Sequence, residues 1–186
     1  MSEYYASARR RVPVVTLVIL ALNVAGLIYE LSVGQNNAVR RFAMYQGALQ
    51  DGEWPRLFVS AFLHFGLAHF GSNMLCLAMF GFDLEVRTSW WRYALIYFIS
   101  IIGSGLLINF AGGNGIHAGA SGAIWGLMTA TVVYNLRNNI NPAYAMRGII
   151  INLIYSFSAG VSWQGHIGGG IAGLAAALLV SDEERL

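Results

Sequence analysis

Residues 12–31 read VPVVTLVILALNVAGLIYEL, a run that is apolar almost throughout. A bilayer core about 30 Å thick needs about 20 such residues in one helix, which is the length of this run. The run follows Arg9, Arg10 and Arg11, is too long for a signal-peptide core, and is followed by similar segments. We therefore interpret it as a retained membrane helix.

Five further segments continue this pattern along the chain: 67–82, 91–110, 120–136, 146–159 and 165–180. Of the 186 residues, 56% are hydrophobic and only 11% are charged, whereas a soluble domain carries about 25% charged residues. Because so few charges cannot coat a soluble fold of this size, lipid must cover much of the surface. The sequence predicts an all-α, polytopic membrane bundle of about six transmembrane helices, in a single domain over residues 1–186.

The arginines predict how this bundle is oriented, since positive residues near helix ends favour the cytoplasmic side. With the N-terminus inside, the outer segments hold Arg40, Arg41 and Arg56, all in one connection, and the other eight arginines lie in inner segments. We expect both termini in the cytoplasm, in a bacterial cytoplasmic membrane. The net charge of +2 is too small to indicate a nucleic-acid partner.

The connection over residues 32–65 exceeds the 12–15 residues of ordinary loops. It mixes apolar side chains with few polar runs. We expect an ordered structure that lies partly in the membrane interface; the alternative is a floppy exposed loop.

Strongly polar groups inside membrane spans are costly and mark functional sites. They occur at the starts of three expected spans, as His69 with Asn73, as Ser121 and as His166. Because these are the even-numbered spans, all three run from outside inward. The groups should therefore lie at one depth, just below the outer surface.

Ser121 occurs in the sequence Gly119-Ala120-Ser121-Gly122 at an expected helix start. The G-x-S-x-G pattern of soluble hydrolases is not met, because the fifth position is Ala123. A packing face of small residues through Gly122 is the alternative to a nucleophile. The helix start favours the nucleophile, because backbone N–H groups of Ala120 and Ser121 would be available to an oxyanion.

His166 follows the first of three glycines at i+4 spacing, with Gly169 in the middle. Close packing of this face against Gly122 would bring the imidazole within hydrogen-bond reach of the Ser121 hydroxyl, as general-base activation requires. No carboxylate is expected nearby, so we predict a dyad in which packing orients His166. A purely structural histidine is the alternative.

His69 and Asn73 are four residues apart and share a helix face, from which both can donate to a developing negative oxygen. His64 and His69 would diverge by about 140° around a helix, which argues against a shared metal site. No H-E-x-x-H motif is present, and we expect no metal and no cofactor. We interpret His117 as a solvent-facing loop residue.

These residues, in this order and spacing, resemble the rhomboid intramembrane serine proteases over about residues 54–180. The resemblance also rests on Trp54, Arg56, His64, Glu85, Arg87 and Trp125. It implies that Ser121 is the nucleophile and His166 the general base. It further implies an oxyanion hole of His69, Asn73 and the Ser121 N–H, and an aromatic ring, Trp125, stacked on the histidine.

The resemblance implies a serine endopeptidase that cuts single-span membrane proteins near the outer face of the bilayer. Water would reach the substrate's peptide bond through a polar cavity lined by His64, His69, Asn73, Ser121 and His166. A non-catalytic rhomboid-like protein that binds membrane clients remains an alternative, although such proteins usually lack the serine or the histidine. A solute transporter fits poorly, because the polar groups do not cluster mid-bilayer and the halves do not repeat.

Overall fold

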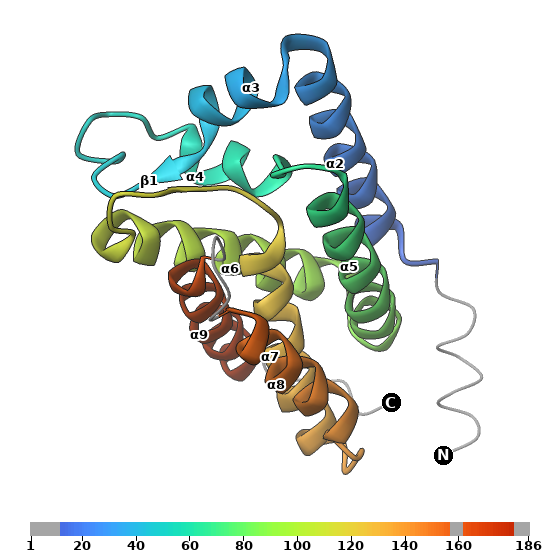
Figure 1. The fold of residues 1–186 in the computed structure, drawn as a ribbon. Helices are drawn as coiled ribbons and strands as arrows, with labels where there is room; N and C mark the ends of the chain where they lie inside the picture. The colour runs from blue at the N-terminus through green and yellow to red at the C-terminus, as the bar shows by residue number, and fades with distance from the viewer. Residues whose placement is uncertain (1–11, 157–161, 181–186) are drawn as a thin grey trace.

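The computed structural model describes residues 12–156 and 162–180. Within these ranges the long helices are α2 (Val14–Val33), α5 (Leu67–Arg87), α6 (Trp90–Ala111), α7 (Ser121–Arg137), α8 (Ala143–Ser156) and α9 (Trp163–Leu179) (Figure 1). Helices α2, α5 and α6 are long and apolar enough to cross a membrane. Helices α7 and α9 have 17 residues each and α8 has 14. The expected membrane bundle is confirmed; that residues 1–186 form one domain stays a prediction.

Some expected helix ends were wrong. Helix α5 continues past Phe82 to Arg87, because the polar residues at its end find partners. The Glu85 carboxylate accepts hydrogen bonds from the amides of Val15 and Thr16, at 2.8 and 2.7 Å, and so joins α5 to the first turn of α2. An acidic group at a helix N-terminus also interacts favourably with the helix dipole.

The last helix begins at Trp163 rather than Gly165, and the Ser162 hydroxyl caps it by accepting from the Gly165 N–H at 3.2 Å. A serine at this position satisfies an amide that has no partner within the helix. The predicted end of the fifth span, Ala159, lies outside the described residues.

The long connection after α2 is ordered, as expected. It contains α3 (Gln35–Phe42), β1 (Met44–Tyr45), α4 (Arg56–Val59) and a 3₁₀ helix, η1 (Ser60–Phe62). Within this connection, the Arg56 guanidinium joins α4 to the end of α3 by donating to the carbonyls of Arg40 and Ala43, at 3.2 and 2.9 Å. The segment β1–α4 packs against α6, and α3 against α2 (Figure 1).

A two-stranded antiparallel sheet joins this connection to the loop before α7, which the all-α prediction did not include. Strand β1 pairs with β2 (Ile116–His117), and Met44 lies opposite His117. Loop backbone groups need hydrogen-bond partners, and a short strand pair supplies them. The sheet therefore anchors the chain that leads into Ser121.

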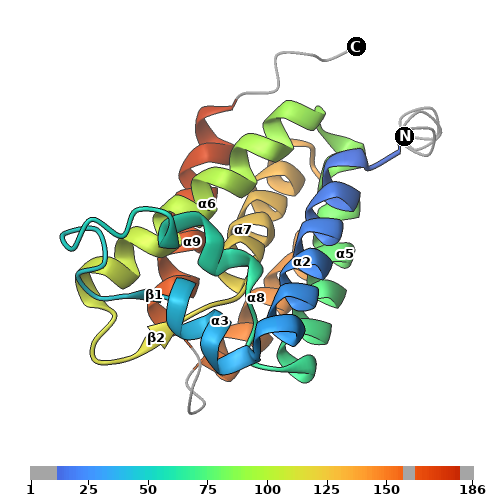
Figure 2. The ribbon, with the colours of Figure 1, turned by 90° about the horizontal axis from the view of Figure 1, so that it is seen from above.

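Helix α9 packs most extensively against α6 and α7 (Figure 2). A Cβ atom on Gly169 would overlap the carbonyl of Gly122, so the two helices meet backbone to backbone as expected. On its other side α9 makes a contact that the sequence did not indicate, where Gly168 lies against the carbonyl of Gly103 in α6. Glycines thus fix the position of α9 from two directions.

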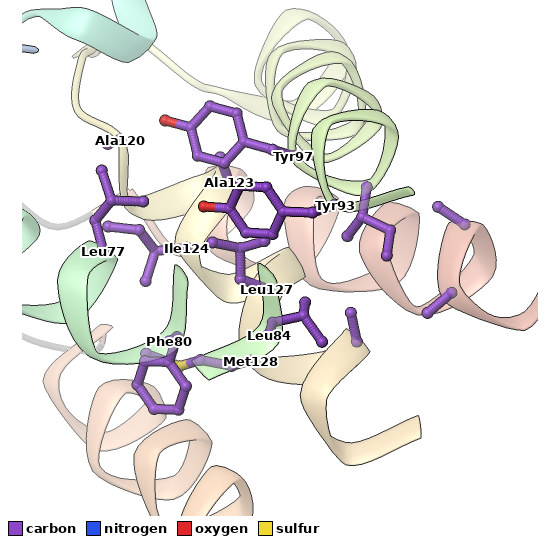
Figure 3. Close-up of a cluster of buried hydrophobic side chains, with 14 of the residues drawn as sticks. Leu77, Phe80, Leu84, Tyr93, Tyr97, Ala120, Ala123, Ile124, Leu127 and Met128 are labelled. Atoms are coloured by element: carbon purple, nitrogen blue, oxygen red, sulfur yellow. The ribbon is translucent and has the colours of Figure 1, made fainter. Parts of the chain in front are cut away.

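The apolar core lies between α5, α6 and α7. Tyr93 and Tyr97 of α6 are fully buried among side chains of α5 and α7 (Figure 3). Leu77 and Leu127 are buried as completely. This core supports the start of α7, because Ala120 and Ala123 belong to the same cluster.

Candidate active site

Ser121 and His166 meet at the start of α7. The Nε2 atom of His166 lies 2.9 Å from the Ser121 hydroxyl oxygen. The two residues are 45 positions apart in sequence, and the backbone contact between Gly122 and Gly169 brings their helices together. The Trp125 indole stacks on the imidazole, with ring centroids 5.3 Å apart and planes at 17°. The resemblance predicted this stacking correctly, and it leaves His166 only 4% exposed.

The turn before Ser121 depends on Gly119. Its φ is +129°, which side chains rarely allow, and a Cβ atom there would lie 2.8 Å from the His69 ring. The Gly119 N–H donates to the Ser60 carbonyl at 2.9 Å. Glycine at this position thus lets the His69 ring lie against the chain two residues before Ser121.

His69 has its proton placed by a backbone contact. Its Nδ1 atom is 3.2 Å from the Phe65 N–H, which can only donate. Nδ1 is therefore the acceptor, and in a neutral imidazole the remaining nitrogen, Nε2, carries the hydrogen. The Nε2–H of His69 lies on the side of Gly119 and is available as a donor.

Asn73 is buried on the same helix, one turn after His69. Its Nδ2 atom donates to the His69 carbonyl at 2.9 Å. One of the two N–H groups of the amide is therefore used within α5, and the other is not used by that bond.

His64 lies differently from our expectation. It precedes α5, so the helical angle between His64 and His69 does not apply, and their rings are in contact with centroids 5.3 Å apart. His64 is fully buried, and its backbone N–H donates to the Glu30 carboxylate. Burial lowers the pKa of His64 to about 3, so the ring is neutral. Within residues 12–156 and 162–180, no cluster of three or more His, Cys, Asp or Glu could hold a metal.

A small open pocket lies beside Ser121. Of the five residues expected to line a wet cavity, only Ser121 lines this one. The other polar side chains of the pocket are Ser60, Ser104, His117 and Ser162.

The interpretation of His117 as solvent-facing was wrong, because strand pairing holds it half-buried with Nε2 3.0 Å from the Gly112 carbonyl. That burial lowers the pKa of His117.

Sequence reasoning missed Ser156. Its hydroxyl oxygen lies 2.5 Å from Nδ1 of His166, so packing alone does not orient the imidazole. The available signal was a serine near the end of an apolar span that precedes the histidine helix.

The apolar helices and the hydrogen-bonded pair together define a class, the integral membrane proteins that carry a serine–histidine site between two helices. The chain belongs to the rhomboid family. The family model described as the Rhomboid domain matches residues 51–183.

Several curated relatives support the same family. The chain is 34% identical over 146 residues to Rhomboid-type serine protease 2 of Emericella nidulans, covering 72% of this chain and 29% of that protein. It is 33% identical over 175 residues to Rhomboid protease GluP of Bacillus subtilis, covering 89% and 34%. It is 30% identical over 140 residues to RHOMBOID-like protein 5 of Arabidopsis thaliana, covering 70% and 45%. The chain thus spans about a third of the length of the first two relatives.

Proposed function

We propose that this protein is an intramembrane serine endopeptidase that uses Ser121 and His166 as a catalytic dyad. The observation that carries the proposal is the 2.9 Å contact between His166 Nε2 and the Ser121 hydroxyl at a glycine-packed junction of α7 and α9. Nucleophile and base within hydrogen-bond reach are the diagnostic arrangement for covalent catalysis. The proteases among the relatives are consistent with it.

The proposed reaction begins when the Ser121 oxygen attacks the scissile carbonyl carbon and its proton moves to His166 Nε2. The resulting oxyanion accepts hydrogen bonds from the Ser121 N–H, His69 Nε2–H and the free N–H of Asn73, with the Ala120 N–H as a further candidate. His166 then gives its proton to the leaving amine as the C–N bond breaks. A water molecule, deprotonated by His166, then attacks the acyl-enzyme ester. As the ester C–O bond breaks, His166 returns the proton to the Ser121 oxygen, which releases the acid and restores the Ser121 hydroxyl.

The proposed substrates are single-span membrane proteins. Apolar helices surround the site, so a substrate helix would reach it from lipid rather than from water. The backbone must leave its helix before Ser121 can attack, because helical carbonyls are already hydrogen-bonded. Residues that destabilise helices should therefore favour cleavage.

A fluorophosphonate probe tests the nucleophile directly. The probe should label the purified protein in detergent at Ser121, as located by peptide mass spectrometry, because it reacts with activated serines. Ser121→Ala should abolish labelling, whereas Ser32→Ala, which removes an exposed hydroxyl on α2, should leave it unchanged. Equal labelling of Ser121→Ala would refute the proposal, and a client-binding protein without catalysis would not label at all.

We further propose that the protein lies in a bacterial cytoplasmic membrane with both termini in the cytoplasm and the dyad near the outer face. The eight-to-three division of arginines supports this orientation. In intact cells, and in a Cys76→Ala background, an impermeant thiol reagent should label Asn114→Cys in the loop before Ser121. It should not label Asn138→Cys at the opposite end of α7. The reverse pattern would overturn the orientation.

A further inference from the structure

We propose that Ser156 is a positioning residue that selects the tautomer of His166 required for catalysis. The inference rests on the proposed function, because it concerns the base of that reaction. Ser156 lies at the end of α8 and is 2% exposed, and its oxygen is 2.5 Å from His166 Nδ1. The dyad and its positioning residue thus come from three helices: the nucleophile from α7, the base from α9 and Ser156 from α8.

The direction of the hydrogen bond follows from counting donors. The Ser156 hydroxyl has one hydrogen, and its oxygen lies 2.7 Å from the backbone carbonyl of Asn152, which can only accept. Ser156 therefore donates to Asn152 and must accept at His166. Nδ1 of His166 accordingly carries a hydrogen.

The same count of hydrogens determines the state of Nε2, the other ring nitrogen. A neutral imidazole with hydrogen on Nδ1 has a lone pair on Nε2. This lone pair faces the Ser121 oxygen at 2.9 Å, so the serine donates to the histidine and is ready to lose its proton. If Ser156 donated instead, Nε2 would carry the hydrogen, which would point at Ser121, and could not take a proton. The Ser156 oxygen would also lie 2.7 Å from the Asn152 carbonyl oxygen with no hydrogen between them.

Ser156 would thus perform the orienting part of the role of an aspartate in a catalytic triad, without its charge. When Ser121 transfers its proton, the imidazolium has N–H groups at both nitrogens and needs an acceptor at each. The Ser156 oxygen is already in place as the acceptor at Nδ1. A hydroxyl suits a site enclosed by apolar helices, because a buried carboxylate is much more costly to desolvate.

Kinetics give the first test. Ser156→Ala should lower kcat on a membrane-embedded substrate about tenfold, the effect of one neutral hydrogen bond, and leave KM within about twofold. Ser156→Thr, which keeps the hydroxyl and the bond to Asn152, should restore most of kcat. Thr131→Val is the matched control, because it removes a buried hydroxyl that donates 2.8 Å away to Leu127 one turn earlier in its own helix. It should keep wild-type kcat.

Nitrogen-15 NMR of the histidine-labelled protein gives a second readout that does not need activity, and the chain has only four histidines. At neutral pH the His166 signal, identified by its loss in His166→Gln, should show hydrogen on Nδ1 and none on Nε2. In Ser156→Ala this ring should become a mixture of tautomers. A wild-type ring with hydrogen on Nε2, or a Ser156→Ala protein with unchanged kcat and tautomer, would overturn the role of Ser156. Retained proteolysis in Ser121→Ala would instead overturn the proposed function, and the NMR result would still decide the Ser156 contact.

Discussion

Ser121→Ala, His166→Ala and the double variant are expected to show nearly the same residual proteolysis of a membrane-embedded substrate, each at least about 10³-fold below wild type. The losses should not add, because a base without its nucleophile activates nothing. Initial cleavage rates of a reconstituted single-span substrate in vesicles would measure them. Losses that multiply in the double variant would mean that the two residues act separately.

The structure determines which carboxylates can serve as controls in this comparison. Asp83 forms an ion pair with Arg87 on the last turns of α5, far along the helix from His69, so Asp83→Asn should keep activity within about twofold. Glu85→Gln is not a clean control, because the Glu85 carboxylate holds the first turn of α2. A lower rate in that variant would reflect stability rather than chemistry.

His69→Phe is expected to lower kcat by about 10²–10³-fold with little change in KM, because removal of one oxyanion donor costs about this much. Phenylalanine keeps the ring that stacks on Phe65, where the centroids are 6.0 Å apart. The substitution therefore keeps an aromatic ring in place while it removes the Nε2–H donor, together with the Nδ1 acceptor of the Phe65 N–H. Full kinetics on the same vesicle-embedded substrate would separate kcat from KM.

The effect expected for Asn73→Ala follows from the contacts of the Asn73 side chain. One N–H of Asn73 already donates to the His69 carbonyl, so Asn73→Ala should lose the remaining donor and also loosen the helix beneath His69. Its kcat should therefore fall too. Unchanged kcat in His69→Phe would remove His69 from the oxyanion hole, and an effect confined to KM would assign it to substrate binding.

The sequence alone determined the class of fold and predicted that Ser121 and His166 would meet. Composition required lipid around the chain, because 11% charged residues cannot cover a soluble surface. The glycine spacing around Gly169 predicted a backbone-to-backbone contact with Gly122, since only a helix face without side chains allows one. That contact was enough to predict that His166 would reach Ser121. These inferences succeeded because they depend on composition and on residue spacing within one helix, neither of which changes when the helices pack together.

Only the tertiary structure decided what surrounds the pair. His64 and His117 were misplaced because each is held by a non-local contact: the Glu30 carboxylate in one case, and strand pairing with Met44 in the other. Ser156 could not be assigned, because its bond to His166 depends on how the end of α8 meets the start of α9. A hydrogen bond requires two atoms to lie about 3 Å apart. Sequence patterns place helix ends only to within several residues, and each residue moves a side chain by about 1.5 Å along the helix and about 100° around it.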